Sequence, residues 1–136
     1  AMTPLIDASV KTIKATAKAV KKRKDDPVVL VVIQTDGYEN CSRKHTAADL
    51  AALVKEKTEA GWEFVFLGAG LDAFEAARSA GVRIDRKKTV QYDRGYSRAV
   101  FRETAVNSAE FLKSGDRDWL DYSQEQRTKV RDKRAT

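Results

Sequence analysis

The sequence has 136 residues, of which 42% are hydrophobic and 34% charged, and a net charge of +6. This composition suits one domain with an apolar core and a well-solvated surface. The longest apolar run, Val28 to Ile33, is far shorter than the ~20 residues that span a bilayer, so we expect no membrane segment. The single cysteine, Cys41, excludes an internal disulfide framework and favours a reducing, cytoplasmic location.

The first two predicted elements are a helix and a buried strand. Apolar residues three to four positions apart predict an amphipathic helix over residues 4–24, which Thr3 caps. The β-branched run over residues 28–33 shows no polar alternation, which is typical of a parallel strand that is buried on both faces.

The middle of the chain continues this alternation. Thr46 and Asp49 resemble a capping box at the start of a helix, and residues 63–67 form a second apolar strand. We expect a short helix over residues 72–81 and then a partly polar strand over 88–92, which suits the edge of a sheet.

The last part of the chain is predicted to be helical. One helix begins at Ser97 and ends at Gly115, and Ser123 with Gln126 resembles a second capping box. The helix that follows has almost no apolar stripe, so we expect it to fray or to rest on a partner.

The order of the elements predicts the fold class. Strand–helix alternation indicates an α/β fold with about three parallel strands flanked by helices. We assign residues 1–115 to this domain and residues 116–136 to a charged helical extension. Functional sites in such sheets lie beyond the carboxyl ends of the strands. In this chain that rim carries Asp36, Gly37, Glu39, Asn40, Gly68, Gly70 and Asp93.

Three short segments form a more specific pattern in combination. Residues 3–5 are Thr-Pro-Leu and are followed by Asp7-Ala8, residues 35–37 are Thr-Asp-Gly, and residues 61–69 are Gly-Trp-Glu-Phe-Val-Phe-Leu-Gly-Ala. This pattern resembles the C-terminal half of von Willebrand factor A (VWA) domains of the bacterial and phage type. The resemblance implies a truncated Rossmann-like three-layer fold and, for a phage protein, a place in the bacterial host cytoplasm.

The VWA resemblance also implies part of a metal site. Members of the family bind a divalent ion, usually magnesium, through a DxSxS loop, a threonine and an aspartate, and the last two correspond here to Thr3 and Asp36. The sequence contains no DxSxS motif, so we expect a degenerate metal-ion-dependent adhesion site and no cofactor. Mg²⁺ would need further ligands from a partner or from a preceding segment. Without a metal, Thr3 caps its helix and Asp36 caps a turn.

The absence of the DxSxS strand has a structural consequence in this family, whose first strand pairs beside the Thr-Asp-Gly strand. We therefore expect an uncovered edge, formed by Val28, Leu30, Val31, Val32 and Ile33, to bind a partner. One version is a homodimer with a six-stranded sheet, and the other is strand addition by a host or phage protein. Ala1 before Met2 leaves open whether the natural chain starts here. The predicted function is a non-enzymatic protein-binding module.

Several alternatives remain open on the sequence alone. The basic runs permit a nucleic-acid-binding protein, with Trp62, Tyr96 and Trp119 as possible stacking surfaces. Cys41 and His45 form a conceivable nucleophile pair, but no third orienting group is apparent, so we do not expect an enzyme. Similarly, a hydrolase that uses Asp36 and a metal needs more ligands than the chain offers. The glycines at 68 and 70 lack the spacing of a phosphate-binding loop.

Overall fold

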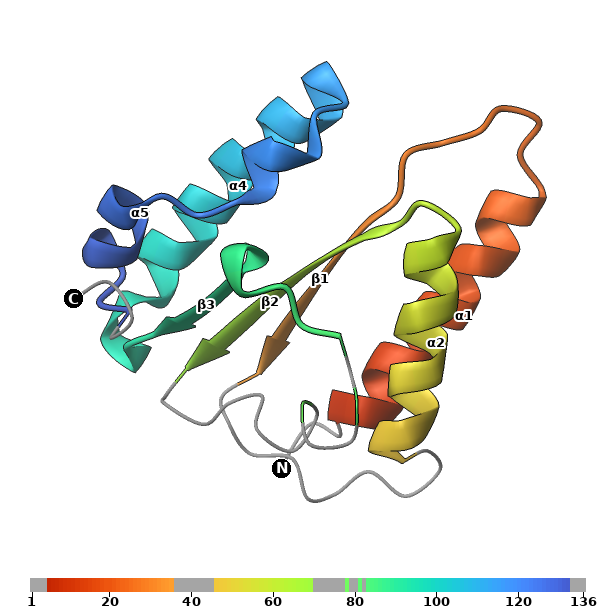
Figure 1. Ribbon diagram of the computed structural model, residues 1–136, viewed down its shortest axis with the longest axis horizontal. Helices are drawn as coiled ribbons and strands as arrows, with labels where there is room; N and C mark the ends of the chain where they lie inside the picture. The colour runs from red at the N-terminus through yellow and green to blue at the C-terminus, as the bar shows by residue number, and fades with distance from the viewer. Residues whose placement is uncertain (1–4, 36–45, 70–77, 79–80, 82, 133–136) are drawn as a thin grey trace.

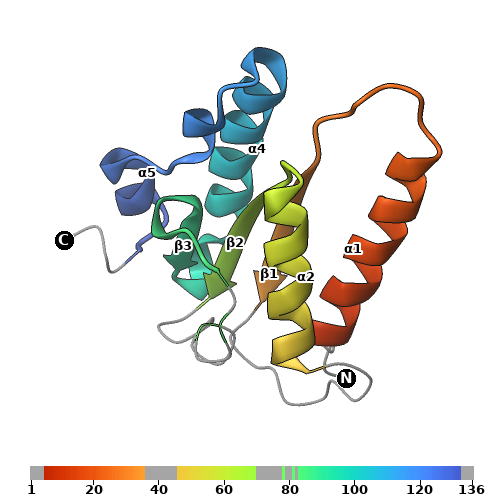
Figure 2. The same ribbon diagram turned by 45° about the vertical axis from the view of Figure 1, so that its right-hand side comes forward.

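The computed structural model describes residues 5–35, 46–69, 78, 81 and 83–132. One parallel sheet has the strand order β1 (Leu30–Thr35), β2 (Glu63–Ala69) and β3 (Thr89–Tyr92), with helices on both faces (Figures 1 and 2). The predicted α/β class with three parallel strands in a Rossmann-like three-layer arrangement is confirmed. The helix expected over residues 72–81 lies almost entirely outside the described residues.

The first face of the sheet is covered by α1 (Leu5–Lys21) and α2 (Ala47–Glu59). Apolar side chains recur on each helix at the three- to four-residue spacing that forms a single stripe. These stripes pack on alternate residues of the first two strands, in a core that contains Val10, Ile13, Leu50, Val54, Val31, Ile33, Phe64 and Phe66. Thr46 and Asp49 form the predicted capping box at the start of α2.

The second face is covered by α4 (Ser97–Ser114) and by the chain after it, which includes α5 (Gln124–Lys129). Leu120, Tyr122 and Val130 belong to the core cluster on this face. Much of the expected C-terminal extension therefore packs against the sheet. The helix α5 itself has no buried residue. The buried side chains of this segment lie before and after the helix, so no helical periodicity in the sequence predicts their burial.

Capping residues fix the ends of the helices on this second face. Gly115 ends α4 in the left-handed conformation (φ 75°), and Ser123 with Gln126 forms the predicted capping box of α5. Three 3₁₀ turns were not predicted from the sequence: η1 (Arg86–Lys88), η2 (Arg94–Tyr96) and η3 (Arg117–Leu120). Each follows an aspartate whose side chain accepts a backbone hydrogen bond two residues on, namely Asp85, Asp93 and Asp116.

The first strand differs from its prediction in position and in burial. It begins at Leu30, so Val28 precedes it. Val29, Val31 and Ile33 are buried on the face covered by α1 and α2, but on the opposite face Val32 is 43% exposed and Val28 56% exposed. The expectation that this run is buried on both faces is therefore wrong. The core cluster of the second face centres on β2, β3 and α4, and of β1 only Leu30 packs against it, half-buried.

Candidate protein-binding edge

The sheet has two outer strands, and the edge of β3 is closed. Residues in a parallel strand alternate in the side to which they direct their N–H and C=O groups. In β3 and the residues on either side of it, odd-numbered positions direct their N–H and C=O groups outward, and four such groups bond to the segment after α4. Tyr122 N–H donates to the Lys87 carbonyl (2.8 Å), Arg127 Nη1 to the Thr89 carbonyl (2.8 Å), Gln91 N–H to Asp132 Oδ2 (3.4 Å), and Asp93 N–H to the Val130 carbonyl (3.2 Å).

The closure of the β3 edge depends on one buried ion pair. Arg127 Nη1 lies 2.8 Å from Asp132 Oδ2, with 11% of the arginine side chain and none of the aspartate side chain exposed. Arg127 Nη2 also donates to the carbonyls of Arg86 (2.9 Å) and Lys87 (3.2 Å). Arg131 has a φ of 59°, and this left-handed residue turns the chain so that Asp132 faces the strand. A guanidinium donates several hydrogen bonds in one plane, which suits a row of carbonyls.

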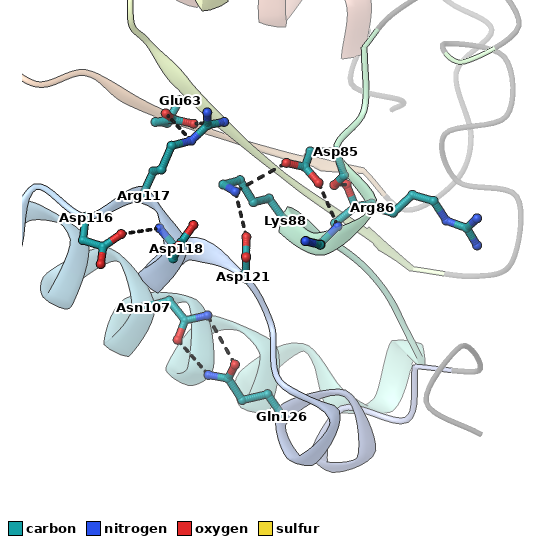
Figure 3. Close-up of polar contacts among 12 residues, drawn as sticks. Glu63, Asp85, Arg86, Lys88, Asn107, Asp116, Arg117, Asp118, Asp121 and Gln126 are labelled. Carbon is teal, nitrogen blue, oxygen red and sulfur yellow. Dashed lines mark hydrogen bonds and ion pairs between the residues drawn. The ribbon is translucent and has the colours of Figure 1, made fainter.

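A second polar cluster joins η1 to the same C-terminal segment (Figure 3). Lys88 Nζ lies 2.7 Å from Asp121 Oδ1 and 3.4 Å from Asp85 Oδ2. Burial disfavours its charge, but the hydrogen bond to Asp121 and the charges of Asp85 and Asp121 outweigh that effect, so the pKa of Lys88 is raised. Beside it, burial raises the pKa of Tyr122 to about 12, although its hydroxyl is hydrogen-bonded to Thr104.

At the opposite edge of the sheet, along β1, the described residues leave the outward backbone groups unpaired. Glu63 N–H donates to the Val29 carbonyl (3.0 Å), so the odd-numbered residues of β1 face β2, and Leu30, Val32 and Gln34 direct their N–H and C=O groups outward. Within the described ranges, no backbone hydrogen bond joins β1 to anything except β2. The Gln34 side chain instead crosses the sheet face and donates to the Tyr92 hydroxyl (2.9 Å).

An apolar surface accompanies this open edge. Val28 and Val32 are exposed on the α4 side of the sheet, and on α4 Phe101 is 47% exposed and Leu112 58% exposed. Exposed apolar side chains beside an open strand edge are typical of a protein-binding site. Sequence analysis identified the strand but not the contribution of α4.

Most of the other residues predicted to form a site lie outside the described residues: Thr3, Asp36, Gly37, Glu39, Asn40, Cys41, His45 and Gly70. Gly68 is buried inside β2, paired with Thr35 and Gln91, and so lies within the sheet. Asp93 accepts a hydrogen bond from Gly95 N–H. Among the residues that the structure describes, no three His, Cys, Asp or Glu side chains gather closely enough to hold a metal ion.

The residues proposed for nucleic-acid contact have varied structural roles. Lys88 and Arg127, from two of the basic runs, are held in ion pairs at the β3 edge. Trp62 is buried and stacks with Phe64, and Tyr96 lies beneath the Arg131 guanidinium, whereas Trp119 is exposed. These residues do not form one aromatic and basic surface.

No protein-family model, curated protein or solved structure matches this chain in the three comparisons. The VWA resemblance therefore stays a prediction from sequence, and the site is described by its own geometry. In the described part of the chain, no helix combines the length and the apolar character needed to cross a membrane.

Proposed function

We propose that this protein is a non-enzymatic protein-binding module that pairs the free edge of β1 with a strand of another polypeptide chain. The unpaired N–H and C=O groups of Leu30, Val32 and Gln34 form the acceptor edge. Strand addition of this kind derives affinity from main-chain hydrogen bonds and specificity from alternate side chains. The predicted VWA resemblance accords with a binding role and does not require a complete metal site.

The contrast between the two edges carries the proposal. Sheets in monomeric proteins protect their edges, because an exposed edge is a template for further pairing. This chain closes the β3 edge with four hydrogen bonds from residues 122–132. At the β1 edge the described residues provide no such closure, and the strand there is uncharged and apolar. A sheet that protects only one of its edges has the asymmetry expected of a strand acceptor.

A proline substitution tests the edge selectively. The Val32 N–H points away from β2, so Val32→Pro removes an outward donor and leaves the β1–β2 ladder intact, as edge strands allow. Val32→Thr keeps the N–H and the β-branched shape and serves as the matched control. Gln34→Pro, at the next outward position, provides a second edge variant if Val32→Pro unfolds, which circular dichroism reports.

The assay is selection from a displayed library of random peptides of about twelve residues, long enough to pair with a strand of usual length. We expect peptides that bind wild type and Val32→Thr and lose at least about tenfold in affinity for Val32→Pro, a loss of about 1.4 kcal/mol. Failure to select any peptide, or selection only of peptides that bind Val32→Pro equally well, refutes edge pairing.

A further inference from the structure

The α4 flank beside the β1 edge carries no charge. Glu103 and Asn107 contact Gln126 at the start of α5, which places α5 on that side of the helix. Residues spaced three and four apart share a helix flank, so the opposite flank consists of Phe101, Ala105, Ser108 and Leu112. This flank is turned away from α5 and β3, toward the side of β1.

The α1 flank on the same side of the molecule is also uncharged. Lys14 and Lys18 line the grooves that α1 shares with α2. The opposite flank carries Ser9, Thr12, Thr16 and Ala19, again at three- and four-residue spacing. Figures 1 and 2 place α1 outermost, beyond α2 on the β1 side of the molecule. The open edge therefore lies between two uncharged helix flanks, although 34% of the residues of this chain are charged.

Basic side chains border this uncharged band. One step further round α4 from its uncharged flank come three exposed cations, Arg98, Arg102 and Lys113. The carboxylates of these helices lie elsewhere. Asp7 is seven residues before Lys14 and so on the α2 side, while Glu103 and Glu110, also seven apart, lie on the α5 side.

We propose that the occupant of the β1 edge is an extended segment of a different protein, uncharged along the paired strand and acidic at its ends. This inference rests on the proposed strand-acceptor function and specifies its partner. Backbone hydrogen bonds of Leu30, Val32 and Gln34 hold the strand, the two uncharged flanks enclose its side chains, and the cationic border attracts its acidic ends.

A second copy of this chain fits the same edge less well. Antiparallel pairing about a two-fold axis normal to the sheet places both α1 helices on one face, above the seam. Packed helices need about 8–10 Å between their axes, whereas neighbouring strands are about 4.8 Å apart. A second copy therefore has to fit two α1 helices above the seam, whereas a single added strand brings no helix there. Each copy also has a net charge of +6, so the two cationic borders repel each other.

Two synthetic peptides of about ten residues, long enough for a paired strand, test the proposal by fluorescence anisotropy. Both alternate valine and threonine, and one ends in two glutamates at each side while the other ends in two lysines. We expect the glutamate-ended peptide to bind about tenfold more tightly at low salt. At high salt the difference should narrow, because exposed charges are screened. Arg98→Glu/Arg102→Glu should reduce this preference, whereas Lys14→Glu/Lys55→Glu, with the same change of net charge away from this border, should retain it.

Three outcomes overturn the inference, and they are distinguishable from failure of the proposed function. If both peptides bind wild type equally and neither binds Val32→Pro, edge pairing is supported but the acidic partner is refuted. Light scattering that detects a dimer of wild type and a monomer of Val32→Pro assigns the edge to a second copy. Binding of either peptide that Val32→Pro leaves unchanged refutes both the inference and the strand-acceptor function.

Discussion

The Arg127–Asp132 pair provides the sharpest test of how the β3 edge is closed. Replacing Arg127 by alanine removes the partner of a carboxylate whose side chain is fully buried. It also removes the donors to the carbonyls of Arg86, Lys87 and Thr89. The buried negative charge then loses its bond to the guanidinium and keeps the longer bond from Gln91 N–H at 3.4 Å.

The structure sets the size of this effect. Breaking a buried ion pair costs about 3–5 kcal/mol, because the remaining charge stays desolvated. Water can reach the carbonyls of Arg86 and Lys87, which are exposed residues, so we expect a loss near the lower limit, about 3 kcal/mol. For a chain of this size that loss lowers the melting temperature by about 10 °C.

Urea denaturation followed by circular dichroism measures this change. The double variant Arg127→Ala/Asp132→Ala should be more stable than the sum of the two single losses predicts, with a coupling of at least about 1 kcal/mol. Lys129→Ala is the matched control, since the Lys129 side chain is 55% exposed and ion pairs of exposed lysines contribute less than about 1 kcal/mol. An ordinary substitution lowers the free energy of unfolding by about 1 kcal/mol. A smaller loss than this for Arg127→Ala would refute the account of a closed β3 edge.

The remaining predictions concern pH and helix ends. The pKa of Tyr122 is about 12 in the folded protein and about 10 when unfolded, so the folded state holds this proton more tightly. The contribution of Tyr122 to the free energy of unfolding should therefore be constant below pH 10 and fall by about 2 kcal/mol as the pH rises toward 12. Denaturation at alkaline pH checks this fall, and Tyr122→Phe should lessen it. Gly115→Ala should cost about 1 kcal/mol because of the positive φ, whereas Gly95→Ala, which has neither a positive φ nor a close neighbour, should be nearly neutral. Thermal denaturation compares these two variants, and equal losses would contradict the argument. Ser123→Ala should lower stability by about 1 kcal/mol through loss of the α5 cap, and no change would show that the cap is dispensable.

Sequence patterns predicted the helices and strands of this fold because apolar residues recur along them at a regular spacing. The apolar runs of β1 and β2, the stripe of α1 and the caps at Thr46 and Ser123 all depend on residues close together in the chain. The 3₁₀ turns were missed, because each depends on a single aspartate cap that has no repeating pattern around it.

The candidate site was predictable only in part. The strand at residues 28–33 was identified as a binding edge through the VWA resemblance, but its one-sided exposure was not, since burial depends on which helix covers which strand. The role of Arg127 and Asp132 had no signal in the sequence. Both lie in a charged segment that is typical of a solvated tail, and only the tertiary fold brings them to Thr89 and Gln91.

Amide hydrogen exchange, followed by NMR at low protein concentration, tests the central claim that one sheet edge is open and the other closed. We expect the outward N–H groups of Val32 and Gln34 to exchange at least about a hundredfold faster than that of Val31, which bonds to β2. The N–H of Gln91 at the β3 edge should be protected like that of Val31. Equal protection of Val32 and Val31 in the monomer would mean that the β1 edge is covered within the chain, and would contradict the account.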